Sequence, residues 1–343
     1  MNNFVHMFNL EEKIPLMDHK MTEHDLNPDA EIQDAVYALA ASPDFIPPER
    51  GICFAARPTG LYRSDDGGLT WQDAYALLEL EAALATAAVV VSPVFESDQA
   101  VFAGVGGGVL RSFDRGRSWH IAALPSPPPF VLSLVISPNF ERDGVLVAGT
   151  MEDGVFRSAD RGSSWSAWNF GLLDLNVLCL AISPYFGHDE TLFVGTDSGI
   201  FRSTNGGRAW REVDFSLDLA PVLSLAISPA FGSDGTLFAG TEANGLFQST
   251  DGGQSWQKLG GERLTGPVNS ILLSPEFPAK PDLLVLSGDS LFVSRDGGQS
   301  WSAWPVELPA EAEVAVTALL APQGLEAGVS LLVGLTDGRV VKV

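Results

Sequence analysis

Five aspartates recur along the chain, each two residues after a serine and five residues before a tryptophan. They are Asp66, Asp114, Asp160, Asp251 and Asp296, and Asn205 takes the sixth place. Carboxylates repeated in this way could bind cations or act as general acids and bases. A catalytic group, however, is needed once, whereas a structural group is needed in every repeat. We therefore interpret these residues as turn-forming rather than catalytic.

Each aspartate belongs to a longer repeat that ends in tryptophan. The string GLYRSDDGGLTW at residues 60–71 returns in five variants, for example GLFQSTDGGQSW at residues 245–256. A second string precedes it, with LAISPYFGHDETLFVGT and LAISPAFGSDGTLFAGT as its clearest copies. Self-similarity at one period indicates a repeat architecture. The closing tryptophans are Trp71, Trp119, Trp165, Trp210, Trp256 and Trp301.

One repeat reads as four short strands. The apolar runs LAIS, LFAGT and GLFRS are bounded by Pro and Gly, and a fourth run follows the tryptophan. Four antiparallel strands in about 40–50 residues match one blade of a β-propeller. The sequence therefore predicts an all-β fold built from such blades, with the repeated turns at their corners.

A seventh, incomplete repeat follows the sixth. The runs VTALLAP, SLLVGL and GRVVKV match its first three strands, and the chain then stops at Val343. We expect one seven-bladed propeller over residues 35–343 and an N-terminal tail, residues 1–34, that supplies the closing strand. An unpaired sheet edge is thereby avoided. FVHMFNL at residues 4–10 and HDLNPD at residues 24–29 are the two candidates.

The motif S-x-D-x-G-x-S/T-W resembles the Asp-box, or BNR, repeat of sialidases, sortilin-type receptors, xyloglucanases and the photosystem II assembly factor family. The resemblance covers residues 36–343 and implies the propeller fold. It implies no single activity, because these proteins share a scaffold and differ in chemistry.

Aromatic side chains outside the boxes could offer platforms for sugars. Trp168 and Trp304 lie three residues after box tryptophans. Their equivalents in the other repeats are apolar as well, which indicates a packing position. These equivalents are Ala74, Ala122, Val213 and Leu259.

The residues that differ between repeats are the candidates for specificity. In a four-stranded blade, the loops between strands two and three and those between blades share one face, and variable loops on a rigid frame carry recognition. Acids recur in the loops between the second and third strands. They predict an acidic arc that binds a cation or a basic side chain, with Arg57 at its open end. The alternative is that these acids reflect only the ordinary preference of turns for Asp. The predicted arc comprises Arg57, Glu152, Asp153, Asp197, Glu242, Asp289 and Asp337.

Charge and targeting signals narrow the partners. The net charge of −23 repels phosphate backbones, so nucleic acid is not expected. No signal peptide or membrane helix is visible, and Cys53 and Cys179 are expected to be buried free thiols. A cytoplasmic location is therefore expected. His6, His19 and His24 lack metal-ligand spacing, and no cofactor or phosphate-loop motif stands out, so no metal or cofactor is expected.

An enzymatic function finds little support in the motifs. Sialidase-type chemistry needs three arginines around a carboxylate and a Tyr–Glu pair, and the family's Arg-Ile-Pro string before the first box is absent. No pair of acids with the spacing of a glycosidase is singled out. The sequence favours a non-catalytic propeller that binds a protein partner as scaffold, sensor or assembly factor. A carbohydrate-binding or glycoside-hydrolase-like propeller is the open alternative.

Overall fold

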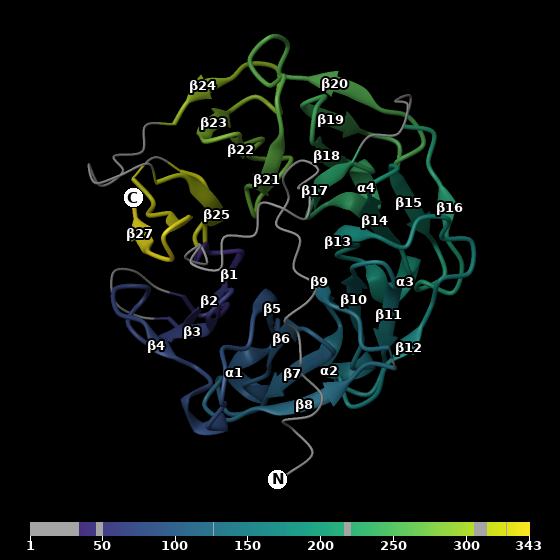
Figure 1. Ribbon diagram of the computed structural model, residues 1–343. Coiled ribbons are helices and arrows are strands. Elements are labelled where there is room, and N and C mark those ends of the chain that lie inside the picture. Colours follow the sequence, from purple (N-terminus) through teal and green to yellow (C-terminus); the bar gives the residue numbers. More distant parts are fainter. Residues whose placement is uncertain (1–33, 46–50, 126, 216–220, 305–313, 327) are drawn as a thin grey trace, which may run out of the picture.

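The computed structural model describes residues 34–45, 51–125, 127–215, 221–304, 314–326 and 328–343. These residues form seven antiparallel sheets arranged around a central axis, one sheet for each sequence repeat (Figure 1). Strands follow one another in chain order within every sheet. The predicted seven-bladed β-propeller is confirmed.

The first strand of each blade lies nearest the axis, and the second strand is next to it. The first strands are β1 (Ala38–Ala41), β5 (Thr86–Val91), β9 (Val131–Ile136), β13 (Val177–Ile182), β17 (Val222–Ile227), β21 (Val268–Leu273) and β25 (Val316–Leu320). The second strands are β2 (Cys53–Arg57), β6 (Val101–Val105), β10 (Leu146–Thr150), β14 (Leu192–Thr196), β18 (Leu237–Thr241), β22 (Leu283–Ser287) and β26 (Leu332–Leu335).

The third and fourth strands complete the blades toward the outside. The third strands are β3 (Gly60–Ser64), β7 (Gly108–Ser112), β11 (Gly154–Ser158), β15 (Ile200–Ser203), β19 (Leu246–Ser249), β23 (Ser290–Ser294) and β27 (Val340–Lys342). The fourth strands are β4 (Gln72–Asp73), β8 (His120–Ala123), β12 (Ser166–Ala167), β16 (Arg211–Glu212), β20 (Gln257–Leu259) and β24 (Ser302–Ala303).

Short helices interrupt the loops between first and second strands. They are α1 (Phe95–Asp98), α2 (Phe140–Asp143), α3 (Phe186–Asp189) and α4 (Phe231–Asp234), and a 3₁₀ turn, η2 (Ala76–Leu78), follows β4. No helix in the described ranges is long and apolar enough to cross a membrane.

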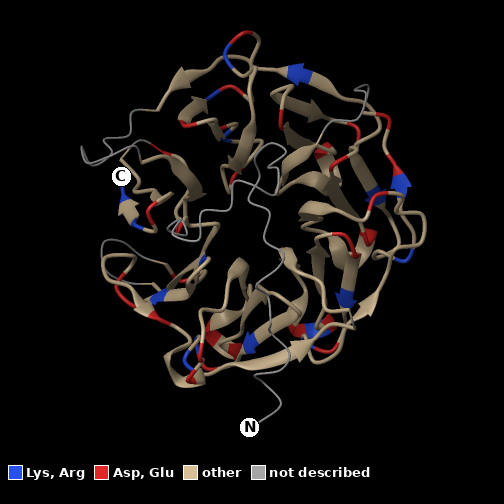
Figure 2. Ribbon diagram, viewed as in Figure 1, with Lys and Arg blue, Asp and Glu red and all other residues tan. Residues whose placement is uncertain are grey.

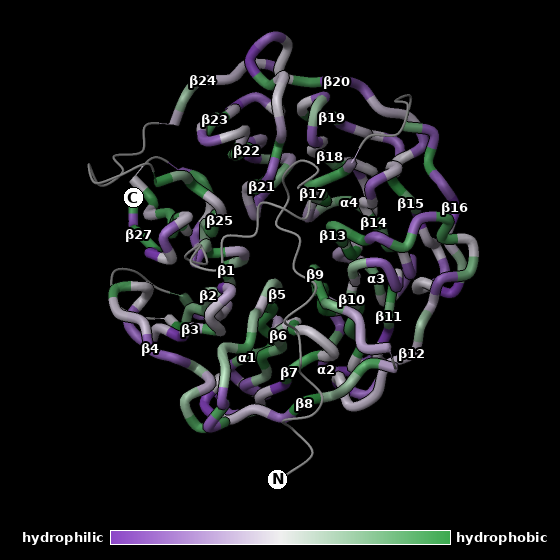
Figure 3. The backbone as a smooth tube through the Cα atoms, in the orientation of Figure 1, coloured by the Kyte–Doolittle hydropathy of each residue, from purple (hydrophilic) through white to green (hydrophobic). Residues whose placement is uncertain are grey.

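The hydrophobic core is divided among the contacts between blades. Phe54 and Leu61 of the first blade, for example, pack with Val101, Leu110 and Trp119 of the second. Hydrophobic residues gather accordingly in the inner strands, and hydrophilic ones in the loops (Figure 3). One blade buries only part of its apolar surface, so neighbouring blades stabilise one another.

Glycines in the second strands allow these blades to approach closely. A Cβ atom on Gly149 of β10 would lie 2.4 Å from the Val177 side chain of the next blade. Gly104, Gly240 and Gly334 meet the following blade at similarly short distances. The repeated glycine of the LFAGT string is therefore required by packing between blades, because any side chain would collide with the next inner strand.

The seventh blade contains three strands among the described residues. The ring closes where Val36, just before β1, donates its backbone N–H to the Leu335 carbonyl of β26 at 3.1 Å. Val36 also occupies the space that a Cβ atom on Gly334 would need. Both predicted closing strands, residues 4–10 and 24–29, lie outside the described residues, so closure by the tail stays a prediction.

Candidate functional site

The repeated aspartates hold the turns that follow the third strands. In the fifth blade, the Ser249 hydroxyl donates to Asp251 Oδ1 at 2.8 Å and accepts the Gly253 N–H at 2.9 Å. The same Oδ1 accepts the backbone amides of Gln254 and Ser255, each at 2.9 Å. Asp251 Oδ2 accepts the Ser255 hydroxyl at 2.6 Å. Both carboxylate oxygens are therefore used within the turn.

Hydrogen bonding keeps these carboxylates ionised. Partial burial raises the pKa of Asp66, but the hydrogen bonds from Thr70 and Ser64 outweigh it and hold the pKa at about 2. At Asp296, the hydrogen bonds from Ser300 hold the pKa at about 2. A carboxylate that accepts several hydrogen bonds is stabilised in its charged form and is a poor proton donor near neutral pH.

A second repeated turn uses the Ser-Pro string. The Ser228 hydroxyl donates to Asp234 Oδ2 at 2.6 Å and accepts the Ala230 N–H at 3.0 Å. Asp234 Oδ1 accepts the Thr236 N–H at 2.8 Å, so this acid also serves a turn. The same serine–aspartate bond recurs at Ser92, Ser137 and Ser183.

The serine is expected to matter more than the aspartate for the stability of a box. Ser249→Ala should lower the free energy of unfolding by about 1–3 kcal/mol, because the buried Gly253 N–H loses its acceptor. Asp251→Ala should lower it by about 1 kcal/mol, because Gln254 and Ser255 are exposed and water can replace the carboxylate.

Urea denaturation of the two variants checks this order. Partner binding should survive in both while the protein stays folded. A larger loss of stability in Asp251→Ala than in Ser249→Ala would contradict the assignment.

The loops divide into two faces, as their hydrogen bonds show. Each box turn contacts the loop between the first and second strands of its own blade: the N–H of Gly252 donates to the Gly235 carbonyl at 2.9 Å. We call this side the box face. Loops between second and third strands contact the loops between blades instead; the N–H of Gly154 donates to the Leu175 carbonyl at 2.8 Å. We call this opposite side the rim face.

The structure places the predicted arc on the rim face. The acids lie in the loops between second and third strands of blades three to seven, and the carboxylate-bearing residues recur around the ring (Figure 2). Most of the predicted acids are exposed, and Asp153 is half-buried. The exposed ones are Glu152, Asp197, Glu242, Asp289 and Asp337.

Arg57 and Asp337 of the arc form ion pairs within the chain. Arg57 Nη1 lies 3.2 Å from Asp34 Oδ2, and its guanidinium lies 3.8 Å from the centre of the Tyr62 ring. Asp337 Oδ2 accepts a hydrogen bond from Arg339 Nε at 2.7 Å. Arg57 therefore braces the start of blade one, and the acids of blades three to six carry the free negative charge of the arc.

The two tryptophans outside the boxes occupy the predicted packing position. Trp168 donates its backbone N–H to the Val155 carbonyl, and Trp304 makes the equivalent bond to Leu291, both at 2.8 Å. The guanidinium of Arg157 lies 4.5 Å from the Trp168 ring centre and that of Arg208 at 5.5 Å. Guanidinium groups thus contact the Trp168 ring, on which a sugar would have to stack.

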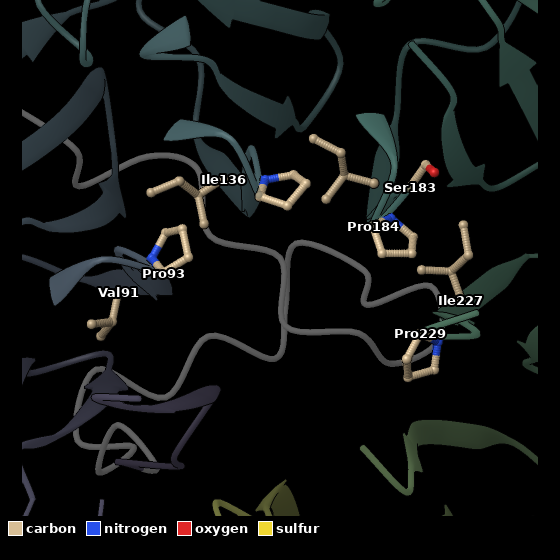
Figure 4. Close-up of a pocket in the computed structure, with 9 residues that line it drawn as sticks. Val91, Pro93, Ile136, Ser183, Pro184, Ile227 and Pro229 are labelled. Carbon is tan, nitrogen blue, oxygen red and sulfur yellow. The ribbon is translucent and has the colours of Figure 1, made fainter. Parts of the chain in front are cut away.

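A shallow apolar hollow of about 190 Å³ opens near the axis on the box face. Its lining comes from the ends of the first strands and the prolines after them in blades two to five (Figure 4). Ser183 is the polar side chain in this lining, and its hydroxyl already bonds Asp189 at 2.6 Å. Among the described residues, those that line the hollow offer apolar surface and no acid or base for chemistry.

One surface feature was missed by reasoning from the sequence. Phe170, Leu173 and Leu175 are exposed on the loop between β12 and β13, which joins blades three and four on the rim face. The string NFGLLDLN at residues 169–176 has a counterpart of equal length after the fourth box, DFSLDLAP at residues 214–221, in which Phe215 aligns with Phe170 but is buried. The apolar residues of the NFGLLDLN string resemble those of a strand. The sequence pattern alone therefore did not distinguish exposed side chains from buried ones.

Comparison with known families and structures agrees with this architecture. The family model for the BNR/Asp-box repeat matches residues 292–303, which span the sixth box. No curated protein matches the sequence. The described residues form six four-stranded sheets and one three-stranded sheet, so the fold is a seven-bladed β-propeller with repeated box turns, and one of these turns matches the BNR/Asp-box model.

Several solved structures share the fold. The GH74 xyloglucanase from Xanthomonas campestris aligns with a TM-score of 0.69 and 19% identity over 90% of this chain and 51% of its own. The extracellular domain assigned to a one component system of B. thetaiotaomicron aligns at 0.63 and 15% identity, over 91% of this chain and 40% of its own. YCF48 bound to D1 peptide aligns with a TM-score of 0.64 and 16% identity, over 91% of this chain and 93% of its own.

These similarities concern the fold. This chain spans about half the length of the xyloglucanase chain and less of the B. thetaiotaomicron domain. At such identities the shared scaffold does not transfer an activity.

Proposed function

We propose that this propeller is non-catalytic and binds a protein partner through its rim face, as a scaffold, sensor or assembly factor. The observation that carries the proposal is the set of exposed acids in the rim loops of blades three to six. The repeated polar residues are occupied by turns, whereas Glu152, Glu242 and Asp289 differ from blade to blade and face solvent. Variable exposed loops on a rigid frame are the usual location of recognition.

The charge of these loops selects the partner. An acidic arc attracts a basic protein surface, and the net charge of −23 strengthens that preference at long range. Two proteins of similar fold lend support, the extracellular domain of a one component system and YCF48 bound to D1 peptide. The sugar-binding alternative is supported by the similarity of the fold to that of a GH74 xyloglucanase. The engaged ring of Trp168 removes one candidate sugar platform.

Neutralising the arc tests the proposal. The triple variant Asp197→Asn, Glu242→Gln, Asp289→Asn should weaken binding of a partner captured from the native host by about tenfold, with little change in melting temperature. Association should also slow as salt rises, because the Debye length falls from about 10 Å at 0.1 M to about 3 Å at 1 M. Surface plasmon resonance of the purified pair measures both effects.

A matched variant removes the same charge from the box face. Asp44→Asn, Glu96→Gln, Glu141→Gln replaces exposed acids outside the rim and should leave binding nearly unchanged. Glu190 is unsuitable for this control because it forms an ion pair with Arg208 at 3.1 Å. Equal weakening by both triple variants would reduce the effect to net charge. If the immobilised propeller retained a polysaccharide from the host extract and no protein, the result would favour the sugar-binding alternative.

A further inference from the structure

The loop of residues 168–176 exposes large apolar side chains on the rim face. Phe170 is 79% exposed, Leu173 78% and Leu175 38%. Single exposed apolar residues are ordinary, but a group on one loop marks an interaction site when the loop is held in place. Whether the loop is held is therefore the deciding question.

Hydrogen bonds fix the first half of the loop against blade four. The N–H of Leu172 donates to the Asn169 carbonyl at 2.9 Å and closes a turn that has Phe170 and Gly171 at its centre. Gly171 has φ +82°, and a Cβ atom there would lie 2.3 Å from the Trp210 carbonyl oxygen. Trp210 in turn donates its N–H to the Phe170 carbonyl at 2.8 Å. The tip is pressed onto the neighbouring blade while the phenyl ring remains in solvent.

The second half is tied to the rim loops of blades three and four, and the Leu175 carbonyl accepts the Gly154 N–H of blade three at 2.8 Å. Asp174 Oδ2 accepts the Ser198 N–H at 2.8 Å, and Asp174 Oδ1 accepts the Asn176 N–H at 3.0 Å. Asn176 Nδ2 donates to Asp197 Oδ2 at 2.6 Å. Leu172 is buried beneath the loop. Phe170 is thus exposed on a loop whose backbone is already ordered in the free protein. Binding a partner would therefore cost little further conformational entropy in this loop.

Acids lie within the loop and in the two loops beside it. Asp174 lies within the loop, Asp197 is bonded to it, and Glu152 and Asp153 form the adjoining loop of blade three. Burial raises the pKa of Asp174, but the amides of Asn176 and Ser198 outweigh it and keep the carboxyl ionised. The segments 151–153, 168–176 and 197–199 contain no Lys or Arg. The guanidinium groups of Arg157 and Arg208 lie on the Trp168 ring at the start of the loop, and the rest of the loop offers apolar contact beside negative charge.

The geometry points to one occupant: a segment of a partner protein with one or two large apolar side chains flanked by Lys or Arg. The apolar side chains would cover Phe170 and Leu173, and the cations would meet Glu152 and Asp197. A second copy of this chain is disfavoured, because it would bring like charges together on a protein of net charge −23. This inference rests on the proposed function and narrows it to one loop and one partner chemistry.

A library of short random peptides displayed on phage tests the inference with the full chain as bait. Selected peptides should share a large apolar residue beside Lys or Arg. The variant Phe170→Ser, Leu173→Ser should bind the consensus peptide at least about tenfold more weakly by fluorescence anisotropy, since central apolar anchors dominate interface energies. Its melting temperature should be retained, because both side chains are exposed.

A matched variant removes apolar side chains from the box face. Leu69→Ser, Tyr185→Ser replaces residues that are 57% and 45% exposed and should leave the peptide affinity within about twofold. Failure of selection, peptides without basic residues, or equal affinity for the Phe170/Leu173 variant would overturn the inference. So would a dimer in sedimentation equilibrium that this variant dissociates. If the rim triple variant weakens peptide binding and the loop variant does not, the loop is wrong and the proposed function stands.

Discussion

Trp119→Ala is expected to lower the free energy of unfolding by about 3–5 kcal/mol, among the largest effects of any single substitution in the chain. The ring is 5% exposed and lies between the first and second blades. Its indole N–H donates to the Ala74 carbonyl of the first blade at 3.0 Å, and the Trp119 and Tyr75 rings pack edge to face with centroids 5.6 Å apart. Truncation opens a cavity between blades and leaves a buried carbonyl without its donor.

Trp256→Ala is the natural comparison. Trp256 occupies the same place in its box, yet its ring is half-buried and its indole N–H has no hydrogen-bond partner among the described residues. Its truncation should cost less, because less surface is lost and no hydrogen bond is broken. Urea denaturation of both variants measures the difference. An equal or greater loss at Trp256 would contradict this account of how the blades are held together.

Acid is expected to unfold the protein steeply between about pH 4 and pH 2. The pKa of Asp66, Asp114, Asp160 and Asp296 lies at about 2 in the folded protein, and that of Asp251 is also lowered. An unfolded aspartate titrates near about 3.9. The stability these groups contribute is therefore fully present above about pH 4 and is lost as pH falls through the folded pKa.

An asparagine box separates this contribution from other causes of acid unfolding. Asn205 Oδ1 accepts the Ser203 hydroxyl and the Ala209 N–H, each at 2.9 Å, so an amide supports the same turn without titrating. Changing all five box aspartates to Asn should flatten the dependence of the unfolding free energy on pH in this window. Thermal denaturation across the pH range measures the slope. An unchanged slope would show that other carboxylates govern acid unfolding.

The blades and the box turns could be predicted because their defining interactions are local. Ser249, Asp251 and Ser255 lie within seven residues of one another, so the string that encodes the turn also contains the groups that satisfy it. The packing position of Trp168 could be predicted from the sequence for the same reason, because Ala74 and Val213 are apolar at the equivalent position of other repeats. Repetition then gave the number of blades, since each copy forms one sheet.

The role of Arg57 required the tertiary structure. Its partner Asp34 is 23 residues away, across a hairpin and on the far side of β1. From the sequence Arg57 was expected at the open end of an acidic arc, whereas in the structure it pairs with Asp34 and braces blade one. Spacing along the chain carries no signal for such a pair.

The amino-acid sequence by itself determined the repeat, the seven blades, the structural use of the repeated aspartates and the acidity of the rim loops. Only the tertiary structure decided which of those acids are free, and that Phe170 and Leu173 stand in solvent on a fixed loop. The physical reason is that exposure depends on what other segments cover. Trp210 and Ser198, which hold that loop, lie 40 and 24 residues from Phe170 and Asp174 and meet them only when blades three and four pack side by side.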